Sequence, residues 1–402
     1  MYLRIRKNCV ITALLIFCLL NLASLDFIGG NALNMLNNLL RVVAAVCALL
    51  LYVIERRRKL SAMVLLTVIM QFWVLFSTIV NHGSLRSCVL SAGSIMALVF
   101  VFESMHANGK DFVHGFMAVS ELVCYANLVS ILLYPNGMYR NVTTAYSWST
   151  ELNWLLGNKN NFTPYLLVFC VVAYLYRSQG GSPVREWGIY IASLISVLLA
   201  RSSASIIGFA LLPIGFLIAR RSKIKLNASF FLAVNAALFL IIVVFRLQDV
   251  FSIVIEFVLN KSLSFTGRTI LWDKVFKLIG EKPLLGYGLQ ETGYLITLTN
   301  VRFGMHAHNI VLQYFFEGGI IYLGLYVTML IMITRRLKKV EQSPEARCII
   351  IALFLFLVMA LMEPYRNPFV YVLYFFGYYI KDFIEQDQKP QKVSLLNSGF
   401  KC

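Results

Sequence analysis

Charged residues are scarce in this sequence. They make up 14% of its 402 residues, against roughly 25% in an ordinary soluble domain. Apolar residues make up 59%, which is more than a soluble globule can bury. Because about 20 apolar residues cross the roughly 30 Å of bilayer hydrocarbon, this content corresponds to about twelve spans. The composition therefore excludes a soluble protein and predicts an all-α integral membrane protein.

Acidic residues are fewer than basic residues. The chain has 19 Asp and Glu against 36 Lys and Arg, which gives a formal net charge of +17. In a soluble chain this excess would suggest a nucleic-acid partner. Here the basic residues gather in alternate connections between apolar runs, as they do on the cytoplasmic side of membrane proteins. The charge therefore indicates topology, and we expect no nucleic-acid partner.

Paired cysteines are lacking. The eight cysteines are scattered and form no C-x-x-C motif, which argues against a disulfide framework and a zinc site. A cleavable leader is not expected either: the first apolar run follows Arg4, Arg6 and Lys7, but no small-x-small cleavage site comes after it. We interpret this run as an uncleaved anchor.

The apolar runs are long and nearly free of charge, as membrane-spanning helices require. We expect both termini and the basic connections around Arg57 and Arg221 to be cytoplasmic, in a multi-pass protein of the inner (cytoplasmic) membrane. The twelve runs are 9–25, 35–54, 60–80, 84–102, 112–134, 161–176, 187–200, 203–219, 226–245, 307–333, 348–362 and 369–383.

This topology divides the chain into four parts. They are helices one to nine with an external loop at 135–160 (1–245), a large external and catalytic loop (246–306), helices ten to twelve (307–383), and a cytoplasmic tail (384–402). An ordered loop longer than about 15 residues usually has a functional reason. We therefore expect the activity to reside on the outer face.

The large external loop contains a short amphipathic pattern. Residues 268–280 are predicted to form a helix that Thr266 caps, and its apolar side, with Leu271, Trp272 and Val275, suits the membrane surface. In the first external loop, aromatic residues offer platforms on which sugar rings can stack. They are Tyr139, Tyr146, Trp148 and Trp154.

The most informative stretch runs from residue 266 to 322. It contains Gly267-Arg268 followed by Trp272, then Pro283-Leu284-Leu285-Gly286-Tyr287-Gly288, and then His308-Asn309, nine residues, Gly319, two residues and Tyr322. In the order and spacing of these motifs the sequence resembles the O-antigen ligase and polymerase superfamily. Gly157-Asn158-Lys159-Asn160 and Arg201-Ser202 also look like features of that family.

The resemblance implies a membrane glycosyltransferase at the outer face. Its donor and acceptor would be glycans on polyprenyl pyrophosphate lipids, polymerised as repeat units of O-antigen, capsule or exopolysaccharide. Membrane lipids, a repeat-unit flippase and a chain-length regulator are the further partners it suggests. One alternative is an O-antigen ligase that delivers glycan to lipid A core, and another, of a different class, is a transporter or lipid flippase.

Three residues are the candidates for catalysis. His308 suits a general base that activates the attacking sugar hydroxyl, because imidazole titrates near neutral pH. Arg268 and Arg201 suit the departing pyrophosphate, because the planar guanidinium can hold two phosphate oxygens and keeps its proton. The candidates for substrate binding are Asn309, Lys159, Asn158, Arg302, Glu317 and Tyr322.

Two further predictions concern the partner of Glu317 and a possible metal site at His306 and His308. Glu317 lies within a span, where a carboxylate is costly, so we expect it to orient His308 or to pair with an arginine. His306 and His308 are two residues apart and could suggest a metal, but no third ligand is near in the sequence. The sequence therefore predicts a metal-independent reaction with no cofactor.

Overall fold

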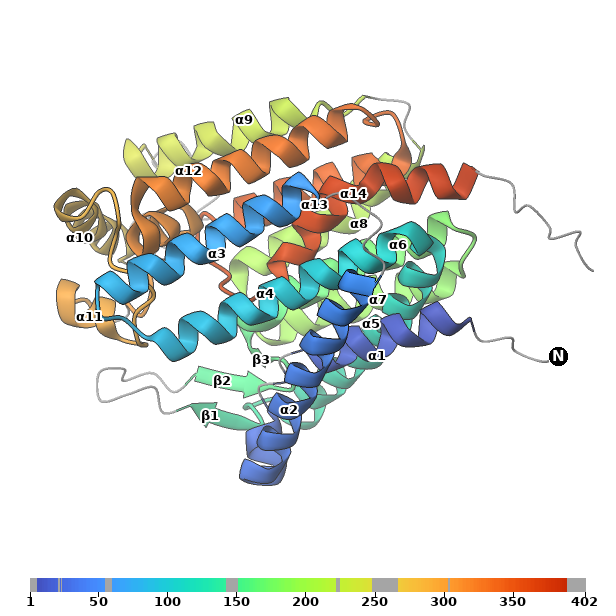
Figure 1. Cartoon of the computed structure of the whole chain (residues 1–402), viewed down its shortest axis with the longest axis horizontal. Helices are drawn as coiled ribbons and strands as arrows, with labels where there is room; N and C mark the ends of the chain where they lie inside the picture. Colours follow the sequence, from blue (N-terminus) through green and yellow to red (C-terminus); the bar gives the residue numbers. More distant parts are fainter. Residues whose placement is uncertain are drawn as a thin grey trace, which may run out of the picture.

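The computed structural model describes residues 6–20, 22, 24–54, 60–141, 151–221, 225–247, 267–302 and 304–388. It is a bundle of long helices (Figure 1). The beginning of α1 (Lys7–Leu19) and the end of α14 (Val370–Gln388) lie at one end of the bundle, whereas α10 (Arg268–Glu281) and α11 (Tyr294–Thr299) lie at the other. This arrangement fits the predicted topology, in which both termini face away from the large loop.

Each of the twelve predicted apolar runs forms a helix. Besides α1 and α14 these helices are α2 (Leu25–Ile54), α3 (Ala62–Val80), α4 (Leu85–Met105), α5 (Gly109–Leu133), α6 (Lys159–Ser178), α7 (Pro183–Leu199), α8 (Ser203–Arg221), α9 (Ala228–Phe239), which continues as the π-helix η2 (Leu240–Val244), α12 (Ile310–Lys338) and α13 (Pro344–Met359). A single 3₁₀ turn, η1 (His106–Asn108), joins α4 to α5.

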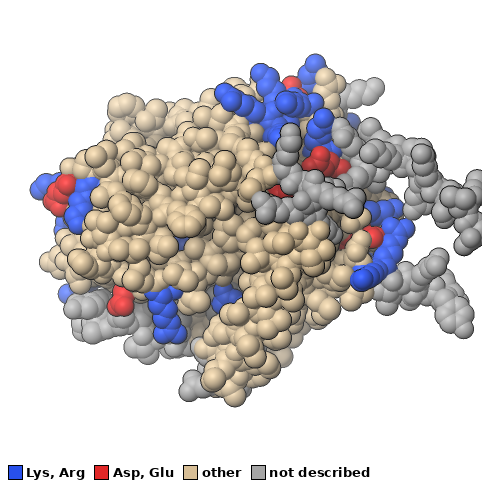
Figure 2. Space-filling model, viewed as in Figure 1, with Lys and Arg blue, Asp and Glu red and all other residues tan. Residues whose placement is uncertain are grey.

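Six helices in the described part of the chain are long and apolar enough to cross a membrane. They lie at Ala32–Ile54, Ala62–Val80, Leu85–Met105, Gly109–Leu133, Ala204–Arg221 and Ile310–Lys338. On the face shown in Figure 2, a wide belt nearly free of Lys, Arg, Asp and Glu separates charged groups at the two ends. The structure therefore confirms a helical membrane protein, while the number of twelve spans stays a prediction.

The connection at 135–160 contains a small sheet that the all-α prediction missed. Strands β1 (Tyr139–Asn141), β2 (Glu151–Trp154) and β3 (Gly157–Asn158) pair antiparallel in the order β1-β2-β3. Trp154 is buried, and its indole N–H donates to the Tyr134 carbonyl (2.8 Å). Its ring therefore packs inside the protein, while Tyr146 and Trp148 lie outside the described residues.

Helix α10 begins and ends almost where the sequence predicts, although Thr266, its expected cap, lies outside the described residues. The prediction that the apolar side of this helix lies on the membrane surface was wrong. Leu271, Trp272 and Val275 are each 0% exposed and belong to a core cluster with residues of η2 and α12. An apolar helix face can be covered by lipid or by protein, and here it packs against protein.

The Pro-x-x-Gly-x-Gly motif contacts a break in α12. Gly318 and Gly319 have non-helical backbone angles, and Gly319 has a φ of 66°. A Cβ on Gly319 would lie 2.0 Å from the Leu284 carbonyl oxygen, so only glycine allows this approach. The Ile320 amide donates to the Pro283 carbonyl (2.8 Å) across the same contact. The motif thus anchors the external loop to α12.

Candidate active site

The segment His306-Ala307-His308 precedes α12 and is held on two sides. The Trp272 indole N–H donates to the Ala307 carbonyl (2.9 Å), and the Ala307 amide donates to the Gln313 side-chain oxygen (2.8 Å). His308 has a φ of 49°, a left-handed conformation that is uncommon for a residue other than glycine. Helices α10 and α12 therefore fix this segment in an unusual conformation.

A carboxylate reaches this segment from the loop after α13. The Ile310 amide donates to the Ala360 carbonyl (3.0 Å), and the Asn309 side-chain N–H donates to the Leu361 carbonyl (3.1 Å). Asn309 is 0% exposed, and its Oδ1 also caps α12 by accepting from Leu312 N–H (3.0 Å). The Ile310 amide and the Asn309 side-chain N–H thus join the end of α13 to the start of α12, which places Glu363 beside the histidines.

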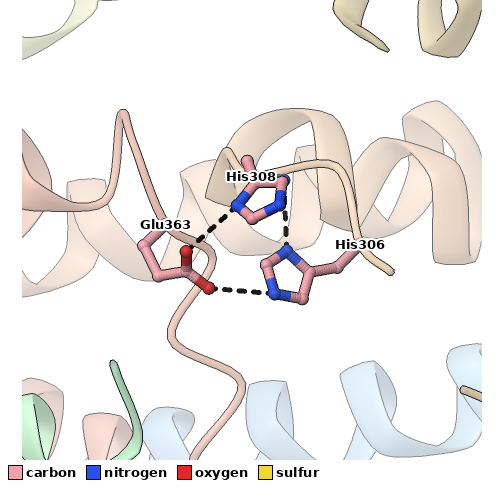
Figure 3. A group of neighbouring side chains, drawn as sticks. All are labelled: His306, His308 and Glu363. Atoms are coloured by element: carbon pink, nitrogen blue, oxygen red, sulfur yellow. Dashed lines mark hydrogen bonds and ion pairs between the residues drawn. The ribbon is translucent and has the colours of Figure 1, made fainter. Parts of the chain in front are cut away.

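Glu363 contacts both histidine rings, and we call these three residues the His-His-Glu group (Figure 3). Glu363 Oε2 lies 3.1 Å from His308 Nδ1, and Glu363 Oε1 lies 3.0 Å from His306 Nε2. The His308 backbone N–H also donates to His306 Nδ1 (3.3 Å). All three members thus hold one another in place.

These contacts select the tautomers. A carboxylate accepts hydrogen bonds, so His308 donates from Nδ1 and His306 donates from Nε2. In the neutral ring the second nitrogen of each histidine then carries a lone pair. His306 accepts the His308 backbone N–H at Nδ1. The contact with Glu363 therefore places the basic nitrogen of His308 at Nε2, while both ring nitrogens of His306 make contacts within the group.

The environment keeps His308 neutral and Glu363 ionised. Burial is the largest cause that lowers the pKa of His308, and His306 and Arg268 lower it further, against the opposing effect of Glu363. Burial by itself raises the pKa of Glu363, but the two histidines outweigh burial and hold that pKa well below its ordinary value. A neutral imidazole oriented by a carboxylate is a suitable general base.

Arg268 opens α10 close to this group. Its charge interacts with Glu363 and lowers the pKa of His308, and burial lowers the pKa of the guanidinium itself. Its Nε atom is buried and has no hydrogen-bond partner among the described residues. A buried N–H donor without a partner is costly. Arg268 therefore retains donor capacity for an anion beside His308.

The His-His-Glu group also matters for the metal prediction. Donor atoms of its three members lie within 4.8 Å of one another. The third possible ligand, Glu363, is distant in the sequence and reaches the histidines from the loop after α13. To bind a metal, both histidines would have to release the N–H groups that face Glu363. His306 would then carry its proton on Nδ1, facing the His308 backbone N–H. Two opposed donors and the nearby Arg268 cation disfavour that state.

Arg201, Lys159 and Asn158 meet at the surface of the bundle. Arg201 is exposed in the turn between α7 and α8, and its carbonyl accepts from Lys159 Nζ (3.4 Å). Asn158 caps α6 by accepting from Asn161 N–H (2.9 Å). Asn367 donates to the Asn161 carbonyl (3.4 Å), which connects this cluster to the loop that carries Glu363. The structure thus groups three of the predicted residues.

Glu317 and Tyr322 line a separate cavity of about 560 Å³. Glu317 is buried and pairs with Arg366 (Oε1 to Nη2, 2.9 Å), so of the two expected roles the structure gives it the pairing with an arginine. Gln313 donates to the same oxygen (2.8 Å). Arg302 is exposed in the turn after α11 and is not among the residues that line the cavity.

Glu363 was not among the residues predicted from the sequence. Glu317 was expected, as one alternative, to orient His308. Glu363 lies 55 residues from His308, at the edge of a predicted span. One signal was available: Glu363 and Arg366 are the charged residues in the short connection between the last two apolar runs. The sequence of that connection does not show that Glu363 contacts the two histidines.

Comparisons with known proteins agree with the sequence motifs. Residues 188–327, which include Arg201, Arg268 and His308 but not Glu363, match the family described as O-antigen ligase. Two proteins named as candidate polysaccharide ligases, from Rickettsia typhi and Rickettsia prowazekii, are 26% and 24% identical over 182 residues. That region covers 43% of this chain and 45% of each relative, so the match spans about half their length.

No solved structure matches the chain. The family match and the two relatives confirm the resemblance to the O-antigen ligase and polymerase superfamily. Together with the apolar helices, they support a multi-pass membrane protein of the O-antigen ligase or polymerase type.

Proposed function

We propose that this protein is a membrane glycosyltransferase that polymerises oligosaccharide repeat units carried on polyprenyl pyrophosphate. The reaction takes place at the outer face of the cytoplasmic membrane, with both termini in the cytoplasm. It needs no metal. The donor glycan leaves its pyrophosphate and is joined to a hydroxyl of a second lipid-linked unit.

His308 is the general base in this proposal. Its Nε2 takes the proton of the acceptor hydroxyl while the hydroxyl oxygen bonds to the anomeric carbon of the donor. The bond from that carbon to the pyrophosphate oxygen breaks, and its electron pair leaves with the pyrophosphate. Glu363 holds the His308 ring and stabilises the imidazolium that forms, as the carboxylate does in other carboxylate–histidine pairs. His306 positions Glu363.

Arg268 stabilises the leaving group. Negative charge grows on the pyrophosphate oxygen as the bond breaks, and preorganised donors aimed at developing charge are the most effective kind of stabilisation. The observation that carries the proposal is the buried Arg268 Nε without a partner, beside a neutral histidine that an ionised carboxylate orients. Arg201 and Lys159 are cations for the outer part of the pyrophosphate or its glycan.

A second candidate function is an O-antigen ligase that transfers the glycan to lipid A core. The names of the two Rickettsia relatives favour it. Both functions use the same base and the same leaving group, so the acceptor distinguishes them. Purified protein should be offered a labelled lipid-linked unit and a lipid A core acceptor in parallel; a ladder of longer lipid-linked glycans supports the polymerase, and labelled lipid A supports the ligase.

The role of Arg268 is tested by substitution. Arg268→Ala should abolish product formation while the protein still inserts into the membrane, and Arg268→Lys should restore little activity, because a point charge cannot replace the planar fork. Lys277→Ala, which removes an exposed cation from α10 itself, is the control for charge alone. Full activity of Arg268→Ala would remove this residue from the reaction.

The metal-independent mechanism has its own test. Activity should survive dialysis against a strong chelator, since the His-His-Glu group is held by hydrogen bonds in the tautomers described above. Activity that disappears on chelation and returns with one divalent ion would instead make these three residues metal ligands.

A further inference from the structure

A cavity with several polar and charged lining residues lies at the end of the bundle that carries α10 and α11 (Figure 1). Its volume is about 560 Å³, and residues of α2, α3, α4, α12 and the loop before α14 line it. Its polar lining includes Arg41, Gln71, Ser91, Ser94, Glu317 and Arg366. Polar and ionised groups are rare inside membrane helices and usually mark the path of a polar substrate.

The cavity and the proposed base share one wall. Tyr365 lines the cavity, follows Glu363 by two residues, and has a φ of 42°. The Arg268 charge also interacts with Tyr365. A ligand that fills the cavity as far as Tyr365 would therefore reach the chain segment whose Glu363 contacts His308.

Arg41 is the most unusual residue of this cavity. It lies within a candidate membrane span of α2, and its guanidinium donates to Ser94 Oγ (2.9 Å) on α4. Ser94 is nine residues after Leu85, the first residue of α4, which places it about 14 Å from that end of the helix. The charge of Arg41 therefore lies well inside the bundle end, at the depth of the outer hydrocarbon.

The surroundings of Arg41 indicate what it binds. Its neighbours on α2, Leu39 and Val42, are 59% and 58% exposed on the outside of the bundle, where lipid would contact them. The cavity has one other arginine, Arg366, which pairs with Glu317. Arg41 thus adds a positive charge where an apolar surface meets the polar residues of the cavity. A phosphate between a lipid tail and a glycan has the matching arrangement.

From this juxtaposition we infer that the cavity binds the acceptor, a glycan attached to a phosphorylated membrane lipid, with Arg41 on the phosphate and the acceptor hydroxyl near Tyr365. The inference rests on the proposed function and gives the two lipid substrates separate anion sites, Arg268 for the donor and Arg41 for the acceptor. The lipid can be a second polyprenyl pyrophosphate unit or a phosphorylated glucosamine lipid.

The test separates the two substrates kinetically. The donor is a lipid-linked unit whose acceptor hydroxyl is replaced by hydrogen, so that it can only donate, and each acceptor lipid is supplied in labelled form. Arg41→Gln should raise the KM for the acceptor by roughly 10-fold to 100-fold, as expected for loss of a charged hydrogen bond. The KM for the donor and kcat should stay within about twofold, the scatter expected of a surface change.

Control variants keep the result specific. Arg86→Gln removes an exposed arginine from the same end of α4 that does not line the cavity, and it should leave both KM values unchanged. Ser91→Trp reduces the cavity volume while Arg41 is kept, and it should raise the acceptor KM as well. Equal changes in the donor and acceptor KM of Arg41→Gln, or the same change in Arg86→Gln, would overturn the inference.

Direct binding keeps this result apart from the proposed function. The measurement is made in the Arg268→Ala background, which removes the proposed anion site of the donor. An acceptor lipid without its reactive hydroxyl should bind this protein in detergent, and adding Arg41→Gln should weaken that binding at least about 10-fold. If this difference is found but the wild type transfers no glycan to either lipid, the cavity assignment holds and the proposed function fails. If the wild type transfers glycan but adding Arg41→Gln leaves the binding of both acceptor lipids unchanged, the assignment fails alone.

Discussion

The two ends of the helical bundle use their charges differently. At the end where α1 begins, Arg220 Nη2 lies 2.7 Å from Glu186 Oε1, and Arg185 pairs with Glu121. Each of these arginines also lies over a tyrosine ring. At the opposite end, the carboxylate of Glu363 faces two histidines, and Arg268 retains a buried N–H without a partner in the described part of the chain.

This difference separates structural charges from functional ones. An arginine that is paired with a carboxylate and an aromatic ring has most of its interactions satisfied within the fold. A buried donor that the fold leaves unpaired costs stability unless a ligand completes it. The comparison therefore predicts that substitutions of Arg268 and of the His-His-Glu group change the reaction, whereas substitutions in the Arg220–Glu186 pair change the stability of the protein.

Within the His-His-Glu group, the largest effect on activity should come from His308→Ala. A positioned general base commonly contributes about 10² to 10⁴ in rate, so kcat should fall by that factor while the lipid-linked donor still binds. Turnover and donor binding should be measured on the same purified sample. His306→Ala should cost far less, because His306 contacts Glu363 and does not supply the base nitrogen; equal losses of turnover and of donor binding in both variants would contradict the assignment.

Glu363→Gln should have the next largest effect, between those of the two histidine variants. The amide oxygen can still accept from one histidine, but the amide nitrogen would then face the N–H of the other, which forces one ring to change tautomer or turn. The expected loss is in kcat, with the KM for both substrates little changed. A loss confined to KM would place Glu363 in substrate binding.

The pH dependence should show the titration of His308. Only the neutral imidazole can act as a base, so the rate should fall as pH drops through the pKa of His308, which burial places below its ordinary value of 6.5. Because Glu363 raises that pKa, Glu363→Gln should move the acidic limb of the kcat profile to still lower pH. An acidic limb that stays in place in this variant would assign the titration to another group.

Breaking a pair at the α1 end should affect stability. Arg220→Met leaves the carboxylate of Glu186 unpaired, and Glu186 is 1% exposed. The expected loss is about 3 kcal/mol, the lower end of the range for a buried pair, because Arg220 is 32% exposed. Thermal unfolding in detergent measures the loss, and kcat of the folded fraction should not change. Adding Glu186→Leu should restore much of the stability.

The orientation of the two ends can be tested without loss of activity. In a background without reactive cysteines, Asn300→Cys should be labelled by an impermeant thiol reagent from outside, whereas Gln342→Cys should be labelled only after the membrane is opened. Both residues are exposed in the structure. The reverse pattern would place the His-His-Glu group on the cytoplasmic side and contradict the proposed reaction at the outer face.

The helices were predictable because the hydrocarbon sets their length and composition. The apolar run at 60–80 became α3 (Ala62–Val80), and the amphipathic pattern at 268–280 became α10 (Arg268–Glu281). The covering of α10 was not predictable, since the same apolar face suits lipid and protein. The short strands around Trp154 were missed because their hydrogen bonds join segments that show no strand pattern of their own.

The sequence by itself determined that this chain is a membrane protein. It also predicted that the long loop lies at the end opposite the two termini, and it singled out His308 and Arg268 as candidate catalytic residues. Local composition and spacing are enough for these conclusions. The tertiary structure decided that Glu363 orients His308, that Glu317 pairs with Arg366, and that Arg41 lines the cavity. The physical reason is that these contacts depend on how α13 joins α12 and on how α2 packs against α4. A pattern along the chain shows which residues prefer burial, but it does not show which residues they contact.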